Sequence, residues 1–314
     1  MPSPTDVPPL AKYFASTEKK TRDKAVKNLA AFLSEAPEDA LSKTEMDKLW
    51  KGIFYCFWMS DKSLVQQALA NELAELLLTI TSTAASLAFL KGFWTTIVRE
   101  WNGIDRLRID KYYMLVRRFV NASFRLLIRT NWENEACRAY NDILTSKGGP
   151  LCSTDTRVSM GLPNHLSDIY LEELNKAYTT ISEQKPHPAP LCTLLDPFFS
   201  LMTQTPTMTV YKRIESSLIL PLLEALATPT RSDDEPGSKR ARKDFELYSE
   251  LIVNACFDDP ESGSVDRAAL KKKLLRKIFE IASLSETKDA NRRKMYTLWK
   301  EGAEEAEEAI ESLS

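Results

Sequence analysis

One of the segments in which positive charge gathers in this chain also carries a helical apolar pattern. Residues 91–129 hold nine lysines and arginines against three acids, although the formal net charge of the whole chain is −2. At 100° per residue, the segment 104–129 gathers apolar side chains on one side of a helix and six bases on the other. Such bases can bind phosphate oxygens or carboxylates. This basic stripe, the candidate RNA-binding or partner-binding surface, consists of Arg106, Lys111, Arg117, Arg118, Arg125 and Arg129.

The pattern leaves the partner of the basic stripe open. A solvated helix face, contact with RNA and contact with an acidic protein all agree with it. Arg108 departs from the division, because it projects into the apolar arc. A charge in a core is costly unless it is paired and hydrogen-bonded. We therefore expect Arg108 in a buried ion pair with a carboxylate from a neighbouring helix, which is a structural role.

Helices must position these residues, and apolar residues recur at helical spacing along almost the whole chain. Only nine of 314 residues are glycine, and helix-forming residues are abundant. We expect an all-α protein of about a dozen helices packed as antiparallel pairs, either a HEAT-like helical repeat or a compact bundle. Two helices follow Thr21 and Ser60, and the others cover roughly residues 44–59, 84–101, 104–129, 131–146, 164–182, 190–204, 208–227, 244–257, 265–283 and 287–312.

Two further basic segments lie towards the C-terminus. The segment 267–284 combines an apolar face with lysines and arginines, as a membrane-surface helix does. The acidic stretch after residue 300 could fold back on it, which favours a contact within the chain or with protein. The stretch 228–244 is rich in charge and proline, and we expect exposed, mobile chain there. Its candidate nuclear-import signal consists of Lys239, Arg240, Arg242 and Lys243.

Catalytic chemistry has little support in the sequence. The two histidines, His165 and His187, are expected to be structural or solvated, and no nucleophile, phosphate-loop or zinc-protease motif occurs. Asp105 and Asp110 could hold Mg²⁺ for nuclease chemistry, but neighbouring bases favour their neutralisation. The five cysteines form no C-x-x-C pair. We expect no enzyme, no cofactor, no metal and no small-molecule substrate.

The composition is that of a folded chain in a reducing compartment. With 43% apolar residues, 314 residues can bury a substantial core. The first residues show no signal-peptide pattern, and the apolar runs are too short for a membrane span. We expect a soluble protein that is not secreted and does not bind membranes.

Four stretches of the chain are distinctive together. They are LWKGIFYCFWMSDKSLVQQALA (49–70), FWTTIVREWNGIDRLRIDKYYMLVRRF (93–119), GLPNHLSDIYLEEL (161–174) and LLDPFFSLMTQTPTMTVYKRI (194–214). In this order they resemble the eukaryotic ribosomal RNA processing protein 1 family, also called the Nop52 family. The resemblance runs through about residues 10–227, and its second string is the most specific.

The resemblance implies an all-α, helical-repeat-like domain in a nucleolar factor that acts in early assembly of the large ribosomal subunit and in pre-rRNA processing. It implies action without catalysis, within a module of assembly factors docked on the pre-ribosome. The residues that match the family's signature are Trp58, Asp61, Lys62, Trp101, Gly103, Asp105, Arg106, Arg108, Asp110 and Lys111.

We therefore expect a non-enzymatic assembly factor of the large ribosomal subunit in the nucleus and nucleolus. Its expected partners are other assembly factors and, through the basic stripe, pre-rRNA. The alternative is a nuclear helical-repeat adaptor that binds proteins without RNA contact. The expected organisation is a flexible N-terminus (1–9), a helical family-like domain (10–227), a mobile loop (228–244) and C-terminal helices with an acidic tail (245–314).

Overall fold

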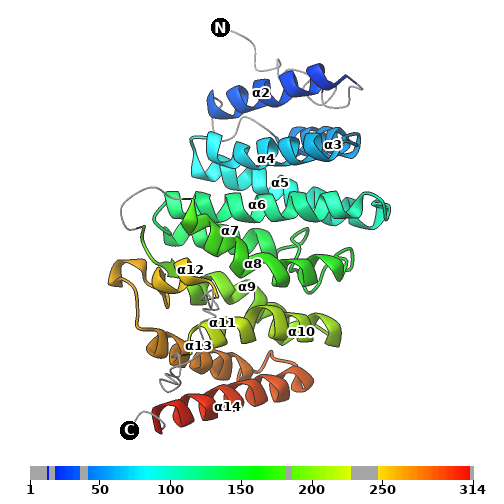
Figure 1. The fold of residues 1–314 in the computed structure, drawn as a ribbon. Helices are drawn as coiled ribbons and strands as arrows, with labels where there is room; N and C mark the ends of the chain where they lie inside the picture. Colours follow the sequence, from blue (N-terminus) through cyan, green and yellow to red (C-terminus); the bar gives the residue numbers. More distant parts are fainter. Residues whose placement is uncertain (1–12, 14–17, 36–41, 181–185, 228–246, 312–314) are drawn as a thin grey trace, which may run out of the picture. The chain divides into compact units, whose positions relative to one another are not determined.

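Helices account for nearly all regular structure in the described residues (Figure 1), which confirms the predicted all-α class. By packing, the chain divides into two compact units, residues 1–162 (unit 1) and 163–314 (unit 2). The sequence-based domain boundaries stay predictions. The computed structural model describes residues 13, 18–35, 42–180, 186–227 and 247–311.

Unit 1 consists of amphipathic helices whose ends lie close to the predicted ones. α3 starts after Ser42, which forms a capping box with Glu45. α6 starts at residue 109 instead of the predicted 104, because residues 105–108 form a separate turn. The elements are α2 (Lys19–Glu35), α3 (Lys43–Trp58), α4 (Ser63–Thr79), α5 (Thr83–Glu100), the 3-10 turn η1 (Trp101–Gly103), α6 (Ile109–Arg129) and α7 (Asn134–Thr145).

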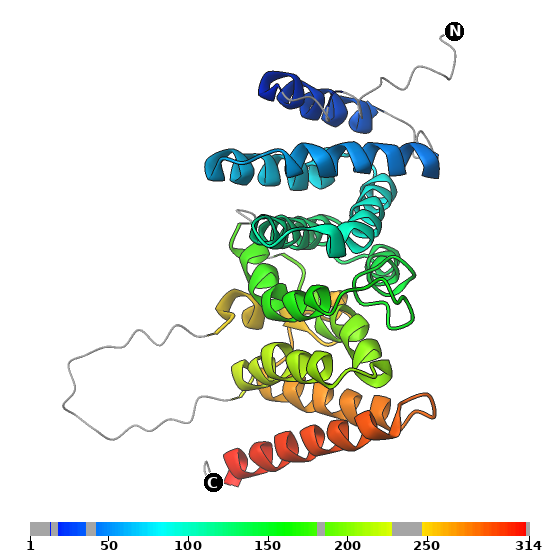
Figure 2. The ribbon, with the colours of Figure 1, turned by 90° about the vertical axis from the view of Figure 1, so that its right-hand side faces the viewer.

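The helices of unit 1 form two layers in which every second helix is a neighbour. α4 packs on both α2 and α6, and α5 packs on both α3 and α7 (Figure 2). α4 and α6 run in the same direction, since Lys111 bonds Ser60 before α4 while Arg129 bonds Leu78 near its end. Stacked helix pairs of this kind are typical of helical-repeat proteins. Within unit 1, the fold is therefore a repeat arrangement.

Trp50 of α3 is the centre of the aromatic core in unit 1. Its indole Nε1 donates to the carbonyl of Phe89 at 3.0 Å, and its ring lies 4.5 Å from the Phe89 ring between centroids. The α5 backbone approaches this ring so closely that a Cβ on Gly92 would lie 2.3 Å from it. Phe93 of α5 stacks at 3.8 Å on Phe119 of α6. This cluster fixes the buried face of α6 against α3 and α5.

The break predicted at residues 146–156 is an ordered loop held by one carboxylate. Asp155 has a side chain only 3% exposed and accepts from the backbone N–H of Gly148 at 2.9 Å. It also accepts from the backbone N–H of Arg157 and pairs with its guanidinium at 2.6 Å. Gly148 has a φ of +91°, a conformation that favours glycine. The loop thus returns to its own start.

Unit 2 contains helices of very different lengths, one interrupted helix and a minimal sheet. Its elements are α8 (Gly161–Thr179, which begins at the end of unit 1), β1 (Ala189–Pro190), α9 (Leu191–Gln204), α10 (Met208–Ile214), a π-helix (Glu215–Ile219), α11 (Leu220–Ala225), α12 (Ser249–Val253), β2 (Ala255–Cys256), the 3-10 turn η3 (Pro260–Ser262), α13 (Arg267–Ala282) and α14 (Asp289–Glu311).

The pairing of β1 with β2 overturns two sequence expectations. No strand was expected, yet β1 and β2 pair in parallel, because the proline-rich segment before α9 is extended and Ala189 N–H donates to Asn254. The helix expected at 244–257 is only the short α12, since the chain leaves the helix at Asn254 to form this pairing. Residues 244–246 lie outside the described residues.

The helix expected at 208–227 is interrupted by the π-helix. Pro221 follows this π-helix at the start of α11. Proline lacks a backbone N–H, and its ring clashes with the carbonyl four residues earlier in a regular α-helix. Widening the helix just before the proline relieves this clash.

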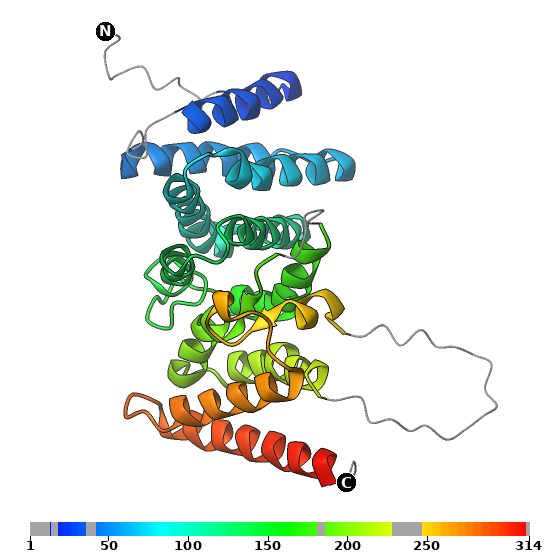
Figure 3. The same ribbon diagram turned by 90° about the vertical axis from the view of Figure 1, so that its left-hand side faces the viewer.

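α13 and α14 form an antiparallel hairpin, drawn orange and red in Figure 3. The apolar face of α13 is buried inside unit 2, so the membrane-surface interpretation of this segment is wrong. Its buried residues include Leu270, Leu274, Ile278 and Ile281.

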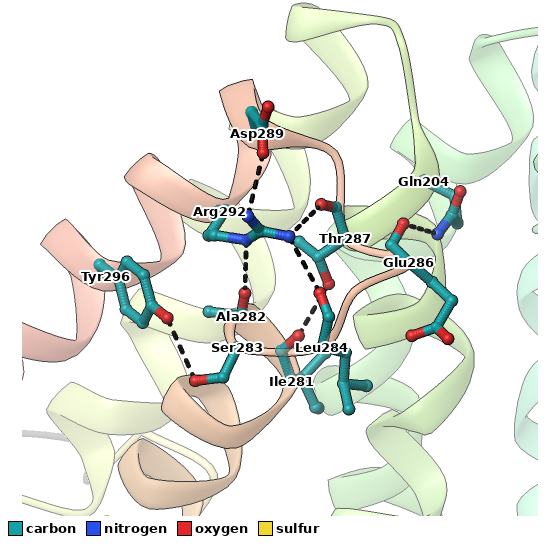
Figure 4. A network of polar contacts seen from close by, with 10 residues as sticks. All are labelled: Gln204, Ile281, Ala282, Ser283, Leu284, Glu286, Thr287, Asp289, Arg292 and Tyr296. Carbon is teal, nitrogen blue, oxygen red and sulfur yellow. Dashed lines mark hydrogen bonds and ion pairs between the residues drawn. The ribbon is translucent and has the colours of Figure 1, made fainter.

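Arg292 holds the loop between α13 and α14 (Figure 4). Its guanidinium forms an ion pair with Asp289 at 3.0 Å and donates to three backbone carbonyls of the loop. The carbonyls left without partners at a helix end need such donors. Gln204 of α9 donates to the loop carbonyl of Glu286 at 2.6 Å, which attaches the hairpin to α9. The backbone oxygens that accept from Arg292 belong to Ala282, Leu284 and Thr287, at 2.9–3.1 Å.

Replacing Arg292 by alanine removes the donors for these carbonyls. We expect the free energy of unfolding to fall by about 1–3 kcal/mol, measured by urea denaturation followed by circular dichroism. Arg293→Ala is the matched control, because Arg293 is the next residue in the sequence and its side chain is exposed. Equal stability of the two variants would show that the loop does not depend on Arg292.

Asp155 predicts an acid-dependent loss of stability. Hydrogen bonds from Arg157, and then from Gly148, hold the pKa of Asp155 well below its usual value. Between the two pKa values the unfolded chain binds more protons, so this stabilisation is present above about pH 4 and declines as the pH falls further. Asp155→Asn should be less stable than the wild type at pH 7, and the difference should shrink in acid. Exposed Asp142→Asn should show no such trend in the same pH series.

Candidate interaction surface on helix α6

A rigid turn precedes α6 and fixes its first residues. The Asp105 carboxylate accepts from the backbone N–H groups of Leu107 and Arg108 at 3.0 and 3.1 Å. The Asp105 carbonyl accepts from the N–H groups of Arg108 and Ile109. The bond from the Arg108 guanidinium lowers the pKa of Asp105. Aspartate in this position replaces a helical turn with an Asx turn.

Arg108 is a pair member, but not a buried one with a distant partner as expected. Its carboxylate partner is Asp105, three residues earlier, and the two side chains are 34% and 39% exposed. The guanidinium carbon lies 5.0 Å from the Trp58 ring centroid. The expectation failed because Arg108 precedes the first helical residue, so its direction on a helical wheel did not apply. A cation over an indole ring joins the turn to the end of α3.

Lys111 was assigned to the exposed basic stripe, and this is wrong. Only 6% of the residue is exposed. Its Nζ donates to the carbonyl of Trp58, the last residue of α3, at 2.7 Å and to that of Ser60, in the turn before α4, at 2.9 Å. Burial lowers the pKa of Lys111, while Asp61 raises it. The side chain therefore connects α6 to the α3–α4 turn instead of facing a partner.

Two further members of the stripe bind α4. Arg125 forms a bidentate pair with Glu75, with the longer bond at 3.3 Å. Arg129 donates to the carbonyls of Leu78 at 2.8 Å and Ile80 at 3.3 Å. Burial lowers the pKa of Arg129. Arg129 thus supplies donors for carbonyls at the end of α4, and Arg125 adds a charged pair one turn earlier.

Arg118 lies seven residues from both Lys111 and Arg125, on the same face of α6. The offset of 50 residues that pairs Arg125 with Glu75 brings Arg118 to Ala68, which has no polar side-chain atom. The Nε of Arg118 is buried and has no hydrogen-bond partner among the described residues.

The two other members of the stripe differ in exposure. Arg117 is half-buried. Arg106 is exposed, and the described part of the chain supplies no partner to it. Arg106 and Arg118 thus remain the strongest candidates for external contacts.

The structure brings the signature residues of the second and first strings together. Trp58 contacts Arg108 and accepts from Lys111 through its carbonyl. Trp101 is buried and lies 5.2 Å from the Tyr113 ring. Sequence reasoning missed the acceptors, because backbone carbonyls leave no mark in an amino-acid pattern. Glu75, the carboxylate partner of Arg125, could have been proposed from the sequence, because it lies one turn before the end of α4.

The described residues contain no group of three histidine, cysteine or acidic side chains placed to hold a metal ion. His165 lies half-buried in α8, and His187 has its Nδ1 3.8 Å from a carboxylate oxygen of Glu261. Asp105 is engaged by Arg108. All five cysteines are buried free thiols. None of the described helices has the length and apolar character needed to cross a lipid bilayer.

The predicted nuclear-import signal, from Lys239 to Lys243, lies outside the described residues. In the other basic segment, Lys271 is buried, whereas Lys272, Lys273 and Arg276 are exposed on α13. Arg276 pairs with Glu280 at 2.9 Å.

Lys111→Met removes the ammonium but keeps a chain of similar length. Because two backbone carbonyls lose a charged donor, we expect the free energy of unfolding to fall by about 1–3 kcal/mol in urea denaturation. The control is Lys62→Met, which changes the same charge at an exposed position of the same turn. A more stable Lys111→Met variant would mean that the dehydration of the ammonium costs more than its two bonds return.

Comparison with known proteins identifies the family. A model of the family described as "Nucleolar protein, Nop52" matches residues 5–299. The match extends past residue 227, where the sequence motifs carried no resemblance. Human "Ribosomal RNA processing protein 1 homolog B" is 34% identical over 270 residues, which cover 84% of this chain and 33% of the relative.

Two further relatives agree. The mouse protein of the same name is 31% identical over 315 residues, covering 92% of this chain and 42% of the relative. Human "Ribosomal RNA processing protein 1 homolog A" is 29% identical over 334 residues, covering 94% of this chain and 70% of the relative. The chain thus spans less than half the length of the two homologues B. With a family match along nearly its whole length, the chain belongs to the Nop52 family of nucleolar proteins.

Proposed function

We propose that this chain is a non-enzymatic nucleolar assembly factor that supports pre-rRNA processing during formation of the large ribosomal subunit. The observation that carries the proposal is the family match over residues 5–299, together with relatives named for ribosomal RNA processing. The family's description as nucleolar proteins supports residence in the nucleolus. Import through Lys239, Arg240, Arg242 and Lys243 stays part of the proposal.

The fold suits a scaffold for other proteins. Stacked helices present long, continuous surfaces on which several partners can bind. In unit 1 this surface is held by bonds between α6 and α4 and between α6 and the α3–α4 turn. We infer that other assembly factors of the pre-ribosome are the main partners.

Direct contact with pre-rRNA is the finer part of the proposal. Lys111, Arg125 and Arg129 bond within the chain, so Arg118 is the stripe member left for phosphate, while the exposed Arg106 is open to RNA or to a protein. The internal use of the other bases equally supports the alternative, a nuclear adaptor that binds proteins without RNA contact. The two functions differ in whether the chain crosslinks to pre-rRNA inside cells.

The test is co-sedimentation of the tagged chain with pre-ribosomes, together with crosslinking and sequencing of bound RNA. We expect both association with large-subunit precursors and crosslinks to pre-rRNA. Absence of both would defeat the proposed function and favour the adaptor, whereas co-sedimentation without RNA crosslinks would remove only the direct contact with pre-rRNA. Cleavage of pre-rRNA by the purified chain with Mg²⁺ would overturn the non-enzymatic assignment.

Charge reversal tests the RNA contact residue by residue. Arg106→Glu with Arg118→Glu should weaken RNA binding and reduce its log–log salt slope by roughly one unit per lost phosphate contact. Lys51→Glu with Lys91→Glu makes the same charge change at two exposed positions of unit 1. An equal loss in both double variants would indicate a general effect of charge instead of contact through the stripe.

A further inference from the structure

Leu107 is an exposed apolar side chain on a rigid support. It is 93% exposed, more than any other large apolar residue among those described. Its backbone N–H donates to the Asp105 carboxylate at 3.0 Å, and the next residue pairs with the same carboxylate. Contact of an apolar leucine side chain with water is unfavourable. The hydrogen bonds of the turn hold the backbone that carries this side chain. A preordered apolar side chain loses little entropy on binding.

The neighbouring surface of α3 is apolar as well. Tyr55 is 40% exposed and Met59 is 38% exposed. They lie three residues before and one residue after Trp58, so the three side chains project from one face of α3 at its end. Trp58 carries the Arg108 guanidinium on its ring, which brings the Leu107 turn next to this face. The knob surface defined here consists of Tyr55, Trp58, Met59 and Leu107.

Cations border the knob surface. Arg106 precedes Leu107, is exposed and has no partner among the described residues. Lys62, in the α3–α4 turn, is exposed too. Among the acids of the adjoining turns, Asp105 pairs with Arg108, and Asp61 lies close enough to Lys111 to raise the pKa of that lysine. A partner with carboxylates around its binding pocket complements this border.

We propose that the knob surface docks a protein, with Leu107 inserted in an apolar pocket whose rim is acidic and faces Arg106. Protein is favoured over RNA because a leucine offers neither a hydrogen bond to a base nor a ring for stacking. Aromatic side chains and arginine around a central apolar residue are also the usual composition of strong protein contacts. This inference rests on the proposed function, since the partner is sought in pre-ribosomes.

The first test measures retention of the full chain on purified pre-ribosomal particles. Leu107→Ser should weaken binding by about 10- to 100-fold, because burying one leucine accounts for one to two factors of ten. Leu107→Met keeps the apolar bulk and should bind nearly as well as the wild type. Leu284→Ser, an equal change at a residue 51% exposed in unit 2, is the control. Unfolding curves of Leu107→Ser should match the wild type, since the side chain is in water.

The second test identifies what touches the knob. A benzophenone amino acid at position 107 should crosslink, on the particle, to a protein segment with apolar residues and carboxylates close together. Crosslinks to RNA alone, or unchanged retention of Leu107→Ser on particles that bind the wild type, would overturn the inference and leave the proposed function standing. If the wild-type chain itself fails to bind the particles, both proposals fail.

Discussion

The ammonium of Lys111 is the point on which the geometry of unit 1 depends. It donates to the carbonyl of Trp58, the last residue of α3, and to that of Ser60 in the turn before α4. A chain reversal between two helices exposes carbonyls that need side-chain donors, and Gln66 of α4 also donates to the Ser60 carbonyl at 2.8 Å. One buried cation from a third helix satisfies two of them. It thereby fixes the start of α6 and, through it, the Asp105 turn and the place of Leu107.

Most charged side chains of α6 therefore bond within the chain, although their pattern in the sequence indicates an external binding surface. The net excess of bases in residues 91–129 invites an interpretation as a phosphate-binding surface. Much of that charge instead bonds to carbonyls and to Glu75. Arginine and lysine at helix junctions can serve as donors for the backbone of a neighbouring helix, with the charge as a by-product. The surface left over is smaller, and it mixes arginine with exposed apolar groups.

Helix positions could be predicted closely from the sequence, whereas the partners of side chains could not. Apolar spacing placed α3 and α5 within one residue of their ends, because burial of one face dominates helix formation. On the wheel, Lys111, Arg118, Arg125 and Arg129 all project within about 40° of one another, close to the apolar arc. That edge position indicated contact with a neighbouring helix, but α4 lies about 50 residues away in sequence. For Arg108 the wheel was the wrong geometry, because Asp105 delays the start of the helix.

α6 is attached to its neighbour near both ends, by Lys111 at the start and by Arg125 and Arg129 at the finish. A residue inserted between these points would rotate the second set by about 100° away from α4. The helix therefore tolerates no change of length between residues 111 and 129. The turn that follows is fixed as well, because Trp132 is buried and its backbone N–H donates to the carbonyl of Leu127 at 2.9 Å. In evolutionary terms, a length change is therefore expected outside residues 111–132, because the distance between the two attachments is fixed.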